Sequence, residues 1–141
     1  MADISEKRIQ RREAIASGEI RLRAETARLV KQGKIEKGDP LQIAKVAAIN
    51  ATKLTPSLMP LCHPIPIENA DVQIEWKGSN IRVEARVVAN SKTGVEMEAL
   101  TAVCAALLNI WDVVKAHEKD ENGQYPFTVI SNIRVLKKLK G

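Results

Sequence analysis

The sequence predicts an α+β fold of two layers, in which helices pack on one antiparallel sheet. Three observations support this prediction: two strand-like runs flank a short turn, a long apolar helix follows them, and another strand-like run returns near the C-terminus. The chain has 141 residues, enough for one sizeable core, and it contains no repeat, low-complexity tract or Gly/Ser linker. We therefore expect a single domain over residues 1–141.

The N-terminal part of the sequence combines a charged segment with a short helix. Residues 1–22 carry a mixed charged pattern that fits a tail, a short strand or an arm contacting a neighbouring subunit. The run AETARLVKQ predicts a helix over residues 24–32, and Gly33 is a typical residue just past a helix end.

A second helix is expected to begin after Asp39, a typical N-cap, with Pro40 at the first helical position. Its apolar residues repeat at helical spacing through residues 41–53, and we expect Pro56 to end it. Residues 55–70, TPSLMPLCHPIPIENA, then carry four prolines. This segment is predicted to be irregular and stiff, so that its side chains are held in place.

The second half of the sequence predicts a hairpin, a long helix and a last strand. Two alternating apolar runs, residues 72–76 and 81–87, are separated by KGSN and are typical of a β-hairpin. A long helix is expected from about residue 94 to residue 116, with a capping box formed by Thr93 and Glu96. After a polar link, residues 129–136 predict the last strand.

The long helix is apolar around most of its circumference. Its polar stripe is narrow and consists of Glu98, Thr101, Ala105 and Asp112. In a chain of this size, such a narrow stripe indicates that a second subunit covers part of the helix. Glu98 and Asp112 lie about 21 Å apart along the axis, so one small reacting centre cannot contact both from one helix. They either serve opposite ends of an extended substrate or belong to a site drawn from two subunits.

The charge balance narrows the class of partner. Lys and Arg number 22 against 17 Asp and Glu, for a net charge of +5. This charge fits either a nucleic acid or an anionic small substrate such as a nucleotide polyphosphate. The single Phe and single Tyr argue against an RNA-recognition sheet, which needs aromatic side chains for stacking.

The sequence also points to a compartment. The N-terminal residues form no hydrophobic signal, and the apolar run over residues 99–111 is too short and polar to span a bilayer, so we expect a cytoplasmic protein without a membrane partner. Cys62 and Cys104 are far apart and lack a CxxC motif, which fits a reducing compartment and excludes a cysteine-only zinc site within one chain.

Several residues can carry chemistry. Asp112 and Lys115 stand three residues apart on one helix, an arrangement that can hold a carboxylate beside an ammonium for acid–base work but is also typical of surface ion pairs. His63 lies in the stiff loop, where it can donate to a phosphate, shuttle a proton or bond to loop backbone. Capping explains Glu96, whereas Glu98 has no such structural role.

Lys37 and Lys53 bracket the second helix at its two ends. Lys37 precedes the Asp39 cap, near the positive end of the helix dipole, where it can anchor a triphosphate or simply be a solvated lysine. The sequence contains no phosphate-binding loop, dinucleotide-binding, zincin or α/β-hydrolase motif.

Four stretches carry a family resemblance: KGDPLQIAKVAAINATK, LMPLCHPIPI, KTGVEMEALTAV and IWDVVKA. In this order and at these spacings they resemble the MoaC family of molybdenum cofactor biosynthesis, over nearly the whole chain. The resemblance implies a ferredoxin-like two-layer subunit that assembles as a homohexamer, a trimer of dimers, with active sites at subunit interfaces. It also implies a lyase that uses no cofactor or metal and converts 3′,8-cyclo-7,8-dihydro-GTP into cyclic pyranopterin monophosphate and pyrophosphate.

The resemblance assigns roles to residues of this chain. It implies four catalytic residues, Asp112, Lys115, Lys37 and His63. It further implies a substrate-binding set that consists of Leu61, Cys62, His63, Met97, Glu98, Glu96, Lys53, Arg12 and Lys138. Asp3 and Lys7 match an N-terminal arm of the family. The chain departs from the family in a longer link between Lys115 and the last strand, which contains ENGQYPF.

These roles suggest a division of labour. Lysines and His63 would bind phosphate, Glu98 would orient the base, and Asp112 with Lys115 would move protons during ring rearrangement. Two other classes remain as alternatives: a basic ferredoxin-like module that binds nucleic acid, and a structural oligomer subunit without turnover.

Overall fold

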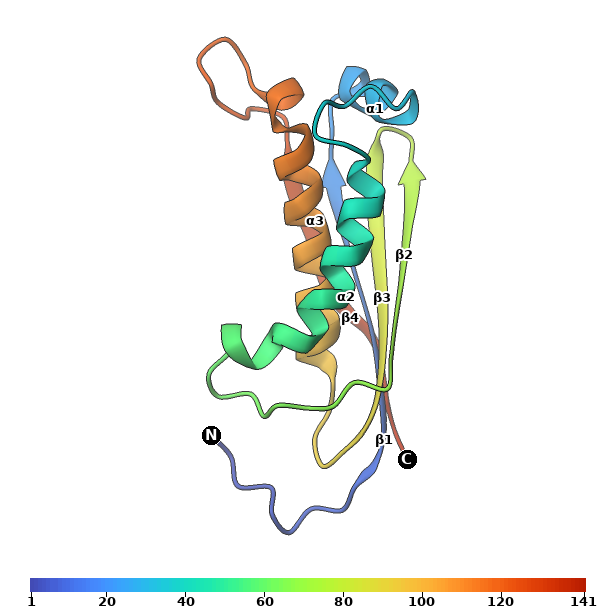
Figure 1. Cartoon of the computed structure of the whole chain (residues 1–141), viewed down its shortest axis with the longest axis vertical. Helices are drawn as coiled ribbons and strands as arrows, with labels where there is room; N and C mark the ends of the chain where they lie inside the picture. Colours follow the sequence, from blue (N-terminus) through green and yellow to red (C-terminus); the bar gives the residue numbers. More distant parts are fainter.

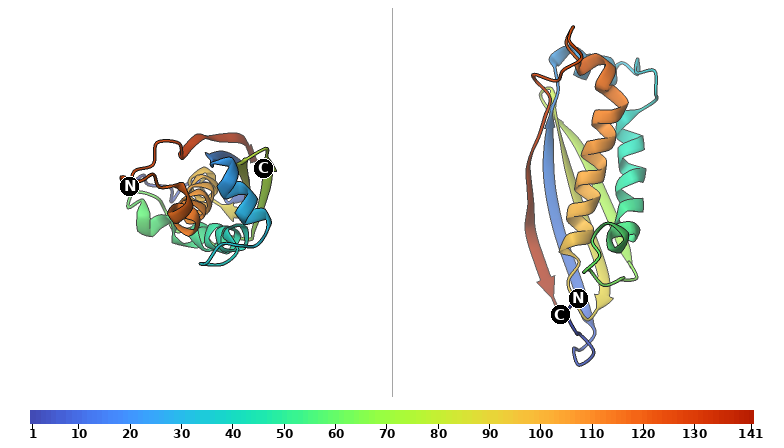
Figure 2. Two further views of the ribbon diagram at one scale, coloured as in Figure 1. Left: turned by 90° about the horizontal axis from the view of Figure 1, so that it is seen from above. Right: turned by 90° about the vertical axis from the view of Figure 1, so that its left-hand side faces the viewer.

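A four-stranded sheet and three helices make up the protein in the computed structural model, which describes residues 1–141 (Figure 1). Helices α2 and α3 lie side by side on one face of the sheet, and the opposite face carries no helix (Figure 2). The elements are β1 (Gln10–Arg21), α1 (Ala24–Lys31), α2 (Pro40–Leu58), β2 (Asn69–Lys77), β3 (Asn80–Ser91), α3 (Glu96–Glu118) and β4 (Val129–Lys140).

The strand order is β2-β3-β1-β4, and every neighbouring pair is antiparallel. The helices between β1 and β2 and the helix between β3 and β4 each cross over one intervening strand. This is the split β-α-β arrangement of the ferredoxin-like fold. The predicted α+β two-layer architecture is therefore confirmed, with its core between the sheet and α2 and α3.

Residues 10–21 form a central strand, so the strand alternative holds for this part of the N-terminal segment. Side chains alternate along β1: Ala14, Ala16 and Ile20 are fully buried toward the helices. On the opposite face Glu13 pairs with Arg11 and Arg86. Residues 1–9 form neither helix nor strand, and contact of this arm with a neighbouring subunit stays a prediction.

The helices α1 and α2 begin where the sequence predicts, but α2 ends later. Asp39 caps α2 because its Oδ1 accepts a hydrogen bond of 2.9 Å from the Leu41 amide. The expectation that Pro56 ends α2 is wrong, because the helix continues to Leu58. A proline removes only its own amide donor, and Met59 N still bonds to Thr55 O at 2.9 Å. Figure 1 shows that the last part of α2 bends away from the axis of the rest.

The helix α3 begins at Glu96 without the predicted capping box. Its N-cap residue, Val95, makes no side-chain cap, and the Glu96 carboxylate instead pairs with Lys138 of β4. A long-range ion pair has thus replaced the local cap. The predicted polar stripe is also partly wrong: Glu98 and Thr101 are buried, because α3 packs against α2 as well as the sheet.

By length and composition alone, α3 is long and apolar enough to cross a membrane. Its position in the fold gives a different explanation. The helix packs against α2 beside it and against the sheet beneath it, and residues such as Val103, Ile110 and Val114 are fully buried there. Its apolar composition is that of a core helix.

The hairpin and the last strand are longer than predicted. β2 and β3 pair from Asn69↔Val88 to Lys77↔Asn80, and Gly78 adopts φ 62°, a left-handed conformation that suits glycine in a tight turn. β4 extends to Lys140 along the outer edge of β1. This pairing places Lys138 opposite Ala14 and Lys140 opposite Arg12, which brings the C-terminal lysines beside the N-terminal end of α3.

Candidate active site

The candidate site residues form two clusters at opposite ends of α3. The Asp112 cluster comprises Lys37, Asp112 and Lys115, near the C-terminal end of the helix. The Glu98 cluster lies at the N-terminal end and comprises Leu61, Cys62, His63, Glu96, Met97 and Glu98. The two carboxylates that name the clusters are separated by about 21 Å of helix axis. One chain therefore does not bring all the sequence-predicted site residues together.

The Asp112 cluster is an ion-pair triad at the surface. Lys115 Nζ lies 3.0 Å from Asp112 Oδ1, as helical spacing predicts. Lys37 reaches the same group from the loop between α1 and α2, with its Nζ 3.2 Å from the Asp112 carbonyl oxygen and 3.5 Å from Oδ1. About half of each side chain is exposed, so the triad is open to a ligand or to another subunit.

Charge fixes the protonation states in this cluster. The hydrogen bond and positive charge of Lys115, together with the charge of Lys37, hold the pKa of Asp112 below its ordinary value. The same contact raises the pKa of Lys115 above its ordinary value. At neutral pH the cluster therefore presents a carboxylate between two ammonium groups.

The Glu98 cluster lines a cavity of about 250 Å³. The proline-rich loop supplies Leu61, Cys62 and His63 on one side, and the first turn of α3 supplies Glu96, Met97 and Glu98 on the other. Residues of the N-terminal arm, Ala2, Ile4 and Lys7, also line the cavity. As the sequence predicts, the proline-rich segment is irregular, and it lies against the N-terminus of α3.

The two glutamates of this cavity differ in environment. Glu98 is 2% exposed, and its burial raises the pKa of its carboxyl group, with a smaller contribution from the nearby Glu96 charge. Burial also acts to raise the pKa of Glu96, but the hydrogen bond and charge of Lys138 outweigh it and lower that pKa. Glu98 thus holds a proton to higher pH than an ordinary glutamate.

A second cavity, of about 390 Å³, adjoins the first and shares Lys7, Thr93, Gly94 and Glu96 with it. Its lining contains no hydrophobic residue. It gathers five cationic side chains against the single carboxylate of Glu96: Lys7, Arg8, Arg12, Lys138 and Lys140. This basic cavity has the charge expected of a polyphosphate site.

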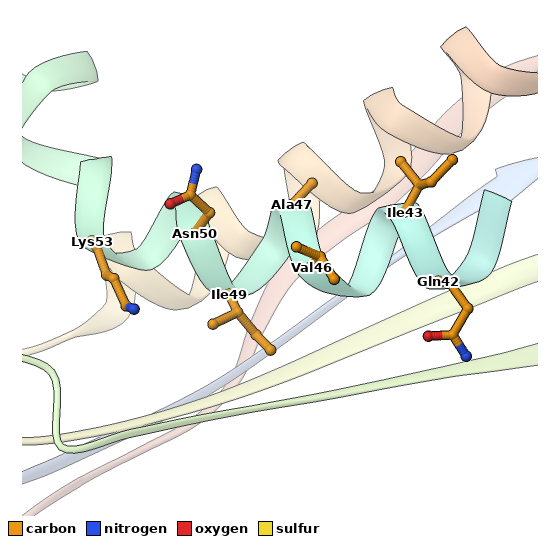
Figure 3. A pocket seen from close by; sticks show the side chains of 7 residues that line it. All are labelled: Gln42, Ile43, Val46, Ala47, Ile49, Asn50 and Lys53. Atoms are coloured by element: carbon orange, nitrogen blue, oxygen red, sulfur yellow. The ribbon is translucent and has the colours of Figure 1, made fainter. Parts of the chain in front are cut away.

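Lys53 belongs to neither cluster. It lines an open hollow along the outer face of α2, with Gln42, Ile43, Val46, Ala47, Ile49 and Asn50 (Figure 3). The hollow has a volume of about 690 Å³, but Lys53 is the only titratable group in it. An apolar hollow formed by one helix suits protein packing better than chemistry.

Sequence reasoning missed two sets of residues near the clusters. Arg8 and Lys140 belong to the basic cavity, and the alternation of Lys138 and Lys140 in a strand was the signal that placed them on one face. Around the Asp112 cluster, Tyr125 packs edge-on to Trp111 with ring centroids 5.3 Å apart, and His117 contacts Glu36. No local sequence pattern predicts these contacts, because they join segments that are distant in sequence.

Comparison with known proteins identifies the family. The model of the MoaC family matches residues 1–141. A relative from Sulfurisphaera tokodaii is 55% identical over 99% of this chain and 93% of its own length; one from Pyrococcus abyssi is 54% identical over 99% and 88%. A third, from Aeropyrum pernix, is 51% identical over 100% and 97%. Each is named a probable cyclic pyranopterin monophosphate synthase, and this chain belongs to the MoaC family.

Proposed function

We propose that this protein converts 3′,8-cyclo-7,8-dihydro-GTP into cyclic pyranopterin monophosphate and pyrophosphate, the reaction of a lyase in molybdenum cofactor biosynthesis. The family assignment and the named relatives support the reaction. The observation that carries it onto this chain is the pair of adjoining cavities. One is lined by Glu98 and His63, and the other gathers five cations without an apolar residue.

The two cavities match the two halves of such a substrate. The cationic cavity, with Arg12 and Lys138, binds the triphosphate through charge-assisted hydrogen bonds. The neighbouring cavity takes the ring system, where the buried Glu98 orients the base and exchanges protons with it. His63 borders this cavity and donates to a phosphate or to a ring oxygen.

The Asp112 cluster supplies the acid–base step. The Asp112 carboxylate accepts a proton from the substrate, and the Lys115 ammonium stabilises negative charge that develops in the transition state. Ring closure of the phosphate follows when a substrate hydroxyl attacks the α-phosphorus. The new P–O bond forms as the bond to pyrophosphate breaks, and the hydroxyl proton leaves to a base.

The two clusters are too far apart in one chain to share a substrate, so we propose that a neighbouring subunit supplies the Asp112 cluster to each pair of cavities. Exposed apolar side chains on the helical face, Val46, Leu54, Leu58 and Leu108, support a covering subunit. A homohexamer built as a trimer of dimers accommodates such shared sites. Light scattering at micromolar concentration should give an oligomeric mass, and a monomeric mass would contradict the shared site.

The decisive experiment is incubation of the purified protein with 3′,8-cyclo-7,8-dihydro-GTP. We expect stoichiometric cyclic pyranopterin monophosphate, detected by mass spectrometry, and pyrophosphate, detected enzymatically. A salt-titrated binding assay with RNA and DNA tests the nucleic-acid alternative, which alone predicts specific binding. A purely structural subunit would release no pyrophosphate. We further propose a cytoplasmic location, which the two unpaired cysteines, Cys62 and Cys104, support.

A further inference from the structure

Lys37 reaches Asp112 from the loop of residues 32–39, which is neither helix nor strand. A side chain on such a loop stays beside its partner only if the loop itself is fixed. The residue before Lys37 provides one fixed point, because Glu36 Oε2 lies 3.0 Å from His117 Nε2. His117 stands two residues beyond Lys115 on α3. The contact therefore ties the loop to the stretch of helix that carries the Asp112 cluster.

Glu118 provides a second fixed point. It is 1% exposed, yet its partners are neutral donors: the Arg23 amide at 3.1 and 3.2 Å from its two oxygens, the Thr26 hydroxyl, and the Thr128 hydroxyl at 2.6 Å. Arg23 is the N-cap residue of α1 and makes no side-chain cap of its own. Glu118 thus caps α1 from α3.

The two fixed points act on the same segment. α1 leads directly into the 32–39 loop, so its capping by Glu118 sets where the loop starts. The His117 carbonyl oxygen adds contacts to α1, with Arg23 Nη1 at 3.1 Å and Thr26 Oγ1 at 3.2 Å. At the far end, the Asp39 cap fixes the start of α2.

We propose that Glu36, His117 and Glu118 are positioning residues of the Asp112 cluster, which hold Lys37 against Asp112. None of them lies among the groups that contact Asp112 directly. The proposal rests on the proposed function for its kinetic readout only. Its chemical consequence is local: when the loop is released, Asp112 keeps Lys115 but loses the second ammonium group.

A double-mutant cycle tests whether Glu36 acts through Lys37. We expect Glu36→Ala to lower kcat by about tenfold while KM changes little, because the misplaced ammonium matters in the transition state. In a Lys37→Ala background, Glu36→Ala should cause no further loss. Glu121→Ala, an exposed acidic residue of the next loop, is the matched control and should keep the parent rate. Equal losses from Glu36→Ala in both backgrounds would overturn the proposal.

A second readout needs no turnover. Titration of the Asp112 carboxyl carbon by NMR should show its pKa rising toward the ordinary value in Glu36→Ala and in folded Glu118→Gln, but not in Glu121→Ala. An unchanged pKa in Glu36→Ala would overturn the role of the Glu36–His117 contact, and an unchanged pKa in folded Glu118→Gln would overturn that of Glu118. Because this titration does not use substrate, it decides the proposal even if the parent protein fails to form product.

Discussion

The two ends of α3 carry carboxyl groups whose pKa values are shifted in opposite directions. Asp112 is exposed and paired with two lysines, so its pKa lies below the ordinary value. Glu98 is buried against the proline-rich loop, so its pKa lies above the ordinary value. Two carboxyl groups whose environments push their pKa values apart are suited to different proton-transfer roles. Asp112 is therefore ionised down to lower pH than an ordinary aspartate, and Glu98 keeps a proton to higher pH than an ordinary glutamate.

The two ends also differ in how they are built. The Asp112 cluster is made by helical spacing plus one loop lysine, whereas the Glu98 cavity is made by a loop, a helix N-terminus and the N-terminal arm. The first depends on charges and the second on shape and burial. Variants of the Asp112 cluster should therefore be sensitive to changes in charge, and variants of the Glu98 cavity to changes in shape and burial.

The largest expected effect is at Asp112. Asp112→Asn keeps the shape of the side chain but removes the ionisable group, and we expect turnover to fall by about 10² to 10⁴-fold. Circular dichroism should show an unchanged fold, because the side chain is exposed. Parent-level turnover would make Asp112 only a surface partner of Lys115.

Mixing two inactive variants tests whether the two ends meet across subunits. Asp112→Asn and Glu98→Gln carry lesions at opposite ends of one helix. If each site takes one end from each of two chains, random reassembly leaves about a quarter of the sites with neither lesion. Turnover should recover to that level after subunit exchange, which mass spectrometry can verify. No recovery in verified mixed oligomers would mean that each site takes both Asp112 and Glu98 from the same chain.

The sequence predicted the Asp112 end better than the Glu98 end. Asp112 and Lys115 follow from helical spacing, and the structure puts them in contact. The stiff loop around His63 was predicted from its prolines, and it does face α3. Glu96 was misread as a capping residue because its partner, Lys138, lies on a strand whose register no local pattern reveals.

Burial along α3 was the second property that the sequence did not predict. A helical wheel gives Glu98 and Thr101 a polar stripe, but it does not show that α2 and the proline-rich loop cover that stripe. The fold class could be predicted from hydrophobic periodicity, which is a local property of the sequence. The central position of β1 could not be predicted, because it depends on how three strands pair. Contacts such as Glu118 with Thr128 depend on that register and leave no sequence signal.

A smaller effect, on stability, is expected from a substitution in β1 under the middle of α3. Gly18 of β1 lies under α3, and an added Cβ would come within 2.8 Å of Val103 Cγ1 and 2.9 Å of Leu107 Cδ1. Gly18→Ala should lower the free energy of unfolding by about 1–3 kcal/mol, since the Val103 and Leu107 side chains, or α3 with them, must shift to make room. Denaturant unfolding measures it, with Ser17→Ala on the opposite face as the control. A cost no greater than that of the control would show that α3 can shift freely.

The smallest effects concern pH and salt. Because the pKa of Asp112 is lowered in the folded state, its contribution to stability is present above its ordinary value of 3.8 and is lost as the pH falls through the lowered value. The sign for Glu98 is opposite: its pKa is raised above 4.5, so its contribution is lost as the pH rises through the raised value. Acidification should therefore remove the stabilising contribution of Asp112, whereas that of Glu98 is retained at low pH.

Salt should separate the causes of these two shifts. Raising the ionic strength from about 0.1 M to about 1 M shortens the Debye length from about 10 Å to about 3 Å. The pKa of Asp112 should then rise toward 3.8, because the charges of Lys115 and Lys37 are screened at this exposed site. The pKa of Glu98 should stay where it is, because burial rather than charge raises it. NMR titration of both carboxyl carbons at the two salt concentrations measures this difference. A fall in the pKa of Glu98 as large as the rise at Asp112 would mean that the charge of Glu96, not burial, controls the pKa of Glu98.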